Sequence, residues 1–415
     1  MRTIGIRRED KNEWESRCPL TPDHVEQLVQ KHGLSIVVEP SDRRIFPDEQ
    51  FQAAGARLDS DLSGCGVILG VKEIPPEQIQ PDTVYVCFAH VIKGQPENME
   101  ALETYLEQGA TLIDYEPIRD NEGSRLVLFG RHAGYAGMID GFWALGQRYK
   151  GQGLETPFQE VRRAFDYDGV RGAKKALGTS VASAISAGAL ASLPPQIFGF
   201  TGSGNVTQGA LEVFETLPYI ELSPQQLLSV DPSQLRRDAV YKVSFQRHHR
   251  DHFAPYLDQL TVLVNGAYWE EGQPKIAPRS ELQRLYSAYT PPRLELIADI
   301  SCDVDGSVEA TTHQTTPGEP VYVYNPATGA TTPGVKGRGP VVLAVGNLPT
   351  ELPRDASETF SEALAPFALQ LAQASFRVPF EELKISPELS RAVITHLGSL
   401  TPAFSYLSET LEALR

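Results

Sequence analysis

Cationic side chains follow successive apolar runs in the N-terminal third of the chain. They are Arg17 in "ESRCPLTP", Lys72 in "GVILGVKEIP", His90 and Lys93 in "VYVCFAHVIK", and Arg125 in "GSRLVLFG". Neighbouring cations disfavour each other's charged forms, so a lysine beside a histidine can hold one pKa near neutrality and transfer protons. Such a cluster also suits a ligand with several carboxylates. The alternative is that polar residues at strand ends merely face solvent.

A glycine-rich turn in "QIFGFTGSGNVTQGALEVF" suggests a second kind of chemistry, the binding of phosphate by backbone amides. Gly202 and Gly204 match the first two glycines of a dinucleotide fingerprint, which permit a tight turn and a close approach to pyrophosphate. Thr207 stands in the third glycine's place, and Gly209 follows. A triphosphate loop is disfavoured, because the Lys and Ser/Thr that it needs do not follow Gly209. A turn that only allows close packing is the alternative.

The residues expected to bind the dinucleotide lie in this turn and in the helix that it opens: Gly202, Ser203, Gly204, Asn205 and Val206. Glu221 ends the next predicted strand. An acidic side chain there binds a ribose 2′-hydroxyl, and taken alone this favours NAD over NADP.

Histidines and cysteines offer few metal ligands in a useful pattern. His249, Asp251 and His252 in "RHHRDHF" lack further ligands, so we interpret this run as a polar helix or loop and expect no metal. The four cysteines show no C-x-x-C pairing and are expected to be reduced, partly buried thiols.

Strands that alternate with helices must position these residues. Apolar runs at 2–8, 34–40, 66–72, 83–90 and 110–116 predict one parallel sheet, and runs at 196–202, 219–223, 260–268, 294–301 and 341–349 predict a second. Segments 134–153, 357–373 and 386–398 are predicted helices. The fold class is therefore α/β, with two Rossmann-like doubly wound parallel-sheet domains and a cleft between them. We place a substrate domain at 1–132 plus 349–415 and a dinucleotide-binding domain at 133–348.

Composition limits the partners. The 415 residues include 37 Lys+Arg and 53 Asp+Glu, a net charge of −16, which argues against a nucleic-acid binder. No run is long and apolar enough for a membrane span, and the N-terminus lacks the apolar core of a signal peptide. We expect a cytoplasmic protein and a homo-oligomer.

Long motifs distributed along the chain support a family resemblance. They include "RREDKNEWESRCPLTP", "ILGVKEIPPE", "FAHVIKGQPENM", "FGRHAGYAGMIDG", "FTGSGNVTQGA", "NGAYWE" and "ADISCDVDGSVE". They closely resemble the lysine 2-oxoglutarate reductase domain of the bifunctional aminoadipic semialdehyde synthases of animals and plants. The chain is more distantly similar to fungal saccharopine dehydrogenases and to the alanine dehydrogenase and transhydrogenase superfamily.

The resemblance implies an oxidoreductase that condenses lysine with 2-oxoglutarate and reduces the imine with NADPH to saccharopine. It implies that Lys72 and His90 are the acid-base groups and that Arg17 contacts a substrate carboxylate. Lys93, Glu116, Arg125 and Asp299 match further pocket positions. The second dehydrogenase domain of the animal protein and a transit peptide are missing, so a separate cytoplasmic enzyme is expected.

The cofactor and the substrates keep alternatives. NADP is expected, with NAD possible, because Arg236 or Arg237 would reach a 2′-phosphate. A related saccharopine, opine or amino-acid dehydrogenase with another amine or keto acid is one alternative. A noncatalytic dinucleotide-binding regulator is another, although Lys72 and His90 are both present.

Overall fold

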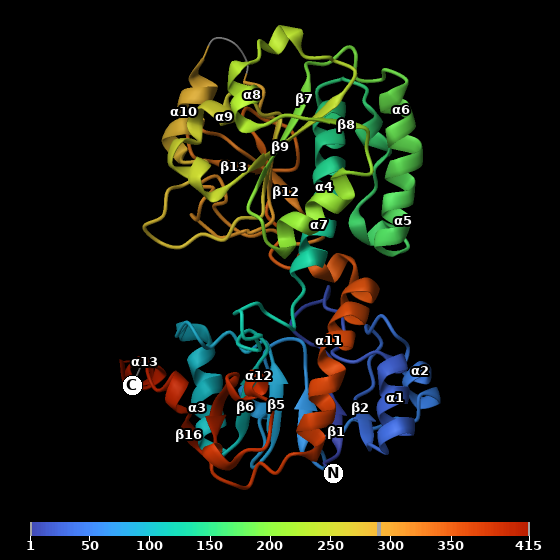
Figure 1. Cartoon of the computed structure of the whole chain (residues 1–415), viewed down its shortest axis with the longest axis vertical. Helices are drawn as coiled ribbons and strands as arrows, with labels where there is room; N and C mark the ends of the chain where they lie inside the picture. Colours follow the sequence, from blue (N-terminus) through green and yellow to red (C-terminus); the bar gives the residue numbers. More distant parts are fainter. Residues whose placement is uncertain (1, 289–291, 414–415) are drawn as a thin grey trace. The chain divides into compact units, whose positions relative to one another are not determined.

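The computed structural model describes residues 2–288 and 292–413, which form two structural units (Figure 1). The first unit comprises Met1–Phe129 and Pro353–Arg415, and the second comprises Gly130–Leu352. Each unit contains a sheet with helices on its faces. Among the described residues, no helix has both the length and the apolar character needed to cross a membrane.

The sheet of the first unit runs in the order β16-β15-β6-β5-β4-β1-β2-β3. The strands from β1 to β6 pair in parallel, whereas β15 and β16 pair antiparallel at one edge. Their bounds are β1 (Ile4–Ile6), β2 (Ile36–Val38), β3 (Arg57–Leu58), β4 (Val67–Leu69), β5 (Val84–Cys87), β6 (Thr111–Asp114), β15 (Val393–His396) and β16 (Ser399–Leu400).

Two apolar cores bury the two faces of this sheet. On β2, Ile36 and Val38 belong to one core and Val37 to the other, because successive side chains of a strand point to opposite faces. The covering helices are α1 (Pro22–His32), α2 (Asp48–Ala53), α3 (Met99–Glu107), α11 (Pro353–Gln373), α12 (Pro387–Ser390) and α13 (Leu407–Ala413). The long helix α11 belongs to the first unit, although it follows the second unit in the chain.

The helix predicted over 386–398 is wrong. The segment contains only the short helix α12 before the chain enters β15, which pairs antiparallel with β6. Val393 packs in one core and Ile394 in the other, so burial follows the two-residue period of a strand. Thr395 Oγ1 accepts from Leu112 N at 3.0 Å and donates to Ala110 O at 2.9 Å, which fixes this edge.

The sheet of the second unit runs in the order β13-β12-β14-β11-β10-β7-β9-β8. The strands are β7 (Gln196–Thr201), β8 (Tyr219–Glu221), β9 (Val240–Phe245), β10 (Val262–Asn265), β11 (Leu296–Asp299), β12 (Val321–Tyr324), β13 (Thr331–Pro333) and β14 (Val341–Leu343). The strands β7 to β11 and β14 pair in parallel with one another, whereas β12 pairs antiparallel with both β13 and β14. Strand β9 was not among the predicted strands.

Helices cover both faces of the second sheet (Figure 1). They are α4 (Gly130–Gly151), α5 (Gly169–Ala176), α6 (Ala182–Ser186), α7 (Asn205–Phe214), α8 (Pro224–Ser229), α9 (Ala254–Leu257) and α10 (Arg279–Ser287). The expected α/β class with two Rossmann-like sheets is thus confirmed.

Candidate active site

Lys72 follows β4 and is anchored through its backbone. The carboxylate of Glu9, fully buried, accepts from Val71 N at 2.7 Å and from Lys72 N at 3.0 Å. Burial and the nearby charge of Arg17 lower the pKa of Lys72. A lysine with a lowered pKa gives up its proton more readily, which suits an acid-base group.

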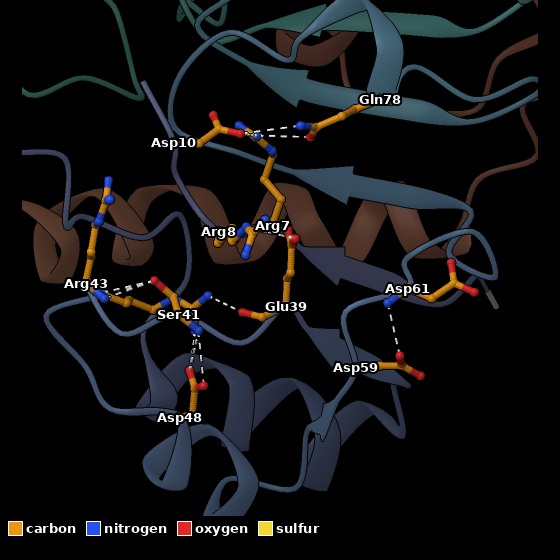
Figure 2. A network of polar contacts seen from close by, with 11 residues as sticks. Arg7, Arg8, Asp10, Glu39, Ser41, Arg43, Asp48, Asp59, Asp61 and Gln78 are labelled. Carbon is orange, nitrogen blue, oxygen red and sulfur yellow. Dashed lines mark hydrogen bonds and ion pairs between the residues drawn. The ribbon is translucent and has the colours of Figure 1, made fainter. Parts of the chain in front are cut away.

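Contacts at the end of β1 hold the segment that carries Glu9 (Figure 2). Arg7 is buried and donates through Nη2 to Asp10 Oδ2 at 2.7 Å and to Gln78 Oε1 at 3.1 Å. Since β1 pairs with β4, these contacts join the segments that follow the two neighbouring strands. They keep Glu9 against the backbone of Lys72.

His90 follows β5 in a backbone conformation that only a minority of residues adopt, with φ of 52°. Its Nδ1 lies 2.7 Å from Glu73 Oε1, and Asn98 Nδ2 donates to its carbonyl at 3.0 Å. Burial alone would raise the pKa of Glu73, but the hydrogen bond and charge of His90 outweigh it and lower the pKa to about 2. Glu73 therefore holds the imidazole in one orientation.

Arg17 is buried against an acidic partner and an aromatic ring. Its Nε donates to Glu15 Oε1 at 2.8 Å, its Nη2 donates to Glu15 Oε2 at 2.5 Å, and its Cζ lies 4.1 Å from the Phe129 ring centroid. The two-point contact fixes the guanidinium plane. The charge of Arg17 lowers the pKa of Lys72, whereas the charges of Glu15 and Glu73 raise it, so Lys72 lies within electrostatic range of all three.

The other predicted residues of the first unit are Lys93, Glu116 and Arg125, and buried Asp114 lies two residues before Glu116. Glu116 Oε1 lies 3.4 Å from Arg125 Nη2, so these two residues form an ion pair. Lys93 is exposed in the loop after His90. Asp114 is fully buried and accepts from the backbone N–H groups of Ala89 and Glu116, and burial raises its pKa to about 6.

The carboxylates of Glu9, Glu15 and Glu73 were missed in the sequence. Each lies in a motif that also contains a predicted residue, because "RREDKNEWESR" holds Glu9, Glu15 and Arg17, and "GVKEIP" holds Lys72 and Glu73. The signal available was that a buried cation requires a nearby anion.

In the second unit, the glycine turn joins β7 to α7. Gly202 has φ of 91°, and a Cβ there would lie 2.8 Å from Gly266 O, so only glycine fits. No atom lies within 4 Å of a Cβ at Gly204, and no side chain caps α7. Ser203, Gly204 and Asn205 are exposed. This open turn with uncapped amides fits a pyrophosphate.

Helix α7 packs closely against α4 through glycine. A Cβ at Gly209 would lie 2.1 Å from Arg131 O, and one at Gly134 would lie 2.0 Å from Val206 O. Thr207, which replaces the third glycine of the fingerprint, donates through Oγ1 to Thr201 O at 3.0 Å. The close approach expected of the third glycine is thus made by Gly209, with Gly134 as its partner.

Asp299, predicted to bind substrate, ends β11 in the second unit inside a hydrogen-bond network. Its Oδ2 accepts from Thr311 Oγ1 at 2.5 Å, and its Oδ1 accepts from Asn265 Nδ2 at 2.8 Å and Ser301 Oγ at 2.7 Å. Burial raises its pKa despite these bonds. The network ties the ends of β10 and β11 together. Its contact with substrate stays a prediction.

Glu221 does not lie beside the glycine turn, so that expectation is wrong. Strand β9 pairs with β7, which leaves β8 at the edge of the sheet. Glu221 aligns with Lys242, which aligns with Phe198, three positions before the end of β7 at Thr201. The carboxylate lies 3.3 Å from Lys242 Nζ. This pairing was missed because β9 was not predicted.

Arg236 and Arg237 precede β9, whose first residue aligns with the first residue of β7. They therefore lie at the amino ends of the strands, whereas the glycine turn lies at the carboxyl ends. Arg236 forms an ion pair with Asp238 at 3.0 Å. The expectation that they reach a cofactor bound at the turn is wrong. The run "RHHRDHF" forms a 3₁₀ helix at Arg247–His252.

Two family models match this chain. "Alanine dehydrogenase/PNT, N-terminal domain" matches residues 5–136, and "Alanine dehydrogenase/PNT, C-terminal domain" matches residues 295–403, together more than half of the chain. The chain belongs to the alanine dehydrogenase/transhydrogenase superfamily. The resemblance to this superfamily that was drawn from the motifs is thereby confirmed.

Relatives of known name extend this result. The chain is 34% identical to "Alpha-aminoadipic semialdehyde synthase, mitochondrial" of Mus musculus over 99% of its own length and 48% of the mouse protein. It thus spans about half of that relative. It is 28% identical to "Saccharopine dehydrogenase [NAD(+), L-lysine-forming]" of Emericella nidulans, covering 89% of this chain and 92% of that one. A solved structure of L-alanine dehydrogenase shares the fold, with a TM-score of 0.65, 20% identity and 99% coverage of both chains.

Proposed function

We propose that this chain is an NADPH-dependent oxidoreductase that condenses L-lysine with 2-oxoglutarate and reduces the product to saccharopine. The observation that carries the proposal is the pairing of His90 Nδ1 with Glu73 Oε1 at 2.7 Å, one residue after Lys72, whose pKa is lowered by burial and by the charge of Arg17. The similarity to aminoadipic semialdehyde synthases over nearly the whole chain supports the substrate pair.

The chemistry requires proton transfer at two stages. The ε-amine of lysine adds to the keto carbon of 2-oxoglutarate, and loss of water from the carbinolamine then leaves an imine. Lys72, with its lowered pKa, and His90, oriented by Glu73, are the groups that take and return these protons. Arg17 and the neighbouring cations bind the carboxylates of the substrates.

NADPH supplies the hydride that converts the imine into a secondary amine. Gly202, Ser203, Gly204, Asn205 and Val206 would bind its pyrophosphate, because the turn leaves space above Gly204 and the amides of α7 are uncapped. The fungal relatives are named for NAD(+), so the choice of NADPH is part of the proposal. The cytoplasmic location and the homo-oligomer stay predictions.

The purified chain, mixed with NADPH, lysine and 2-oxoglutarate, is expected to oxidise NADPH and to form saccharopine, identified by mass spectrometry. Reactions that lack lysine, or that contain another diamine or amino acid, are the controls. Oxidation that depends on a different amine would assign the alternative opine or amino-acid dehydrogenase. Binding of NADPH without turnover for any amine would assign the noncatalytic regulator.

A further inference from the structure

The segment that follows β9 lies next to the glycine turn. Phe245, the last residue of β9, aligns with Thr201, the last residue of β7, and neighbouring strands are about 4.8 Å apart. Gln246 and Gly202 therefore follow the carboxyl ends of two neighbouring strands and lie side by side. The next residues, Arg247–His252, form the 3₁₀ helix.

This place in the sheet has a known use in dinucleotide-binding folds. The strand beside the one that leads into the glycine turn ends near the adenosine ribose, where an acidic residue binds the 2′-hydroxyl of NAD or an arginine accommodates the 2′-phosphate of NADP. In this unit β7 has two neighbours, β10 and β9, and β9 lies on the side to which the chain crosses after α7, because the next strand, β8, pairs with the far side of β9. The residues after β9 therefore occupy the ribose-reading position.

These residues are basic and lack acidic partners. Arg247 is exposed, and within the described residues no carboxylate forms an ion pair with Arg247 or Arg250. Arg247 and Arg250 are three positions apart in the 3₁₀ helix, which places them on the same face of it. Burial lowers the pKa of Arg250, and the charge of Arg247 lowers it further. Asp251 is exposed and pairs with neither. Two such cations together favour an anion.

Arg250 is also held in place. Its Nη1 donates to Gln273 Oε1 at 3.1 Å, and Gln273 belongs to the segment that follows β10. Since β9 and β10 are the two neighbours of β7, this bond joins the segments on both sides of the glycine turn's strand. The 3₁₀ helix is fixed as well, because Gln246 N donates to His249 Nδ1 at 3.0 Å.

We propose that Arg247 and Arg250 bind the 2′-phosphate of NADPH and so set the preference for NADPH over NADH. The inference rests on the proposed function, since it assumes a dinucleotide at the glycine turn. It assigns a role to "RHHRDHF" and replaces Arg236 and Arg237 as the expected cations.

Calorimetric binding of two adenosine fragments tests this assignment without catalysis. The whole chain should bind adenosine 2′,5′-bisphosphate more tightly than 5′-AMP. Arg247→Ala and Arg250→Ala should each lower the affinity for the bisphosphate by about ten- to a hundredfold, the loss expected for a hydrogen bond to a charged group. The affinity for 5′-AMP should stay unchanged. Arg236→Ala, which removes an exposed arginine from the amino ends of the strands, is the matched control and should change neither fragment.

Equal affinity of the whole chain for the two fragments would overturn the proposal, as would an unchanged bisphosphate affinity in both variants. A loss of bisphosphate affinity in Arg236→Ala alone would return the role to that residue. Failure of the proposed function is a separate result, because the fragments can bind as expected while lysine and 2-oxoglutarate give no saccharopine.

Discussion

The two sheets separate two features that dinucleotide-binding folds usually combine. The parallel strands of the first unit have the usual doubly wound order, β3-β2-β1-β4-β5-β6, but a charged segment follows β1 in place of a glycine turn. The second unit has the glycine turn after β7, but its next two strands are exchanged in the sheet. Strand order alone therefore identifies neither the phosphate-binding turn nor the residue that reads the ribose.

The two sheets also differ in what occupies their carboxyl ends. In the first unit, paired charges with shifted pKa values lie there, among them Lys72, Glu73 and Glu9. In the second unit the glycine turn presents backbone amides, and Asp299 is buried among hydroxyl and amide groups. The carboxyl ends of the strands are therefore suited to proton transfer in the first unit and to binding a phosphate in the second.

The largest effect is expected from removing the acid-base groups of the first unit. Lys72→Met and His90→Met should each lower turnover by about two to four orders of magnitude, because proton transfer to the intermediates is lost. Steady-state rates measure the effect. Dinucleotide affinity is the control, since the second unit is unchanged, and full turnover in either variant would remove that residue from catalysis.

The next effect concerns the pH dependence of stability. Burial raises the pKa of Glu9 from 4.5 to about 7, so the folded chain binds more protons than the unfolded chain between these values. Protonated Glu9 therefore stabilises the folded chain fully below about pH 4.5. This contribution to the free energy of unfolding, on the order of 3 kcal/mol, is lost as the pH rises through 7.

Glu9→Gln should flatten this part of the profile. Chemical denaturation at several pH values measures the profile. The difference between variant and parent separates the contribution of Glu9 from that of Asp114, whose pKa is raised to about 6. An equally steep profile in Glu9→Gln would contradict the assignment.

Tight packing behind the glycine turn predicts a smaller loss, confined to the second unit. Gly209→Ala should destabilise by about 1–3 kcal/mol, because its Cβ would overlap Arg131 O at 2.1 Å. Gly172→Ala in α5 is the matched control, since its Cβ would meet only Asp168 Cβ at 3.6 Å. Thermal unfolding should give Gly209→Ala a lower stability than Gly172→Ala. Equal stability of the two variants would show that α7 and α4 move apart at little cost.

The smallest effect is expected at Glu221. Because Glu221 pairs with Lys242 on the edge strand, Glu221→Gln should leave the ratio of NADPH to NADH affinity unchanged. A shift of that ratio toward NADPH in fluorescence titrations would restore the usual ribose-binding role and would remove the contrast between the two strand orders.

Local features of the sequence predicted much of this protein. The apolar β-branched runs predicted strands correctly, because successive side chains of a strand pack into the cores on the two faces of the sheet, as Val37 and its neighbours do. The turn at Gly202 was predictable because its positive φ requires glycine. The positions of Lys72 and His90 after strands β4 and β5 followed from the same runs.

Tertiary structure decided what these features meet. The partners Glu9 and Glu73, the packing of Gly134 on Gly209, the return of β15 to β6 and the insertion of β9 between β8 and β7 all join distant parts of the chain. A single sequence specifies the conformational preference of each segment through local sterics and hydrophobic period. Which segments become neighbours depends on the packing of the whole unit, and that packing placed the end of β9, rather than the end of β8, beside the end of β7.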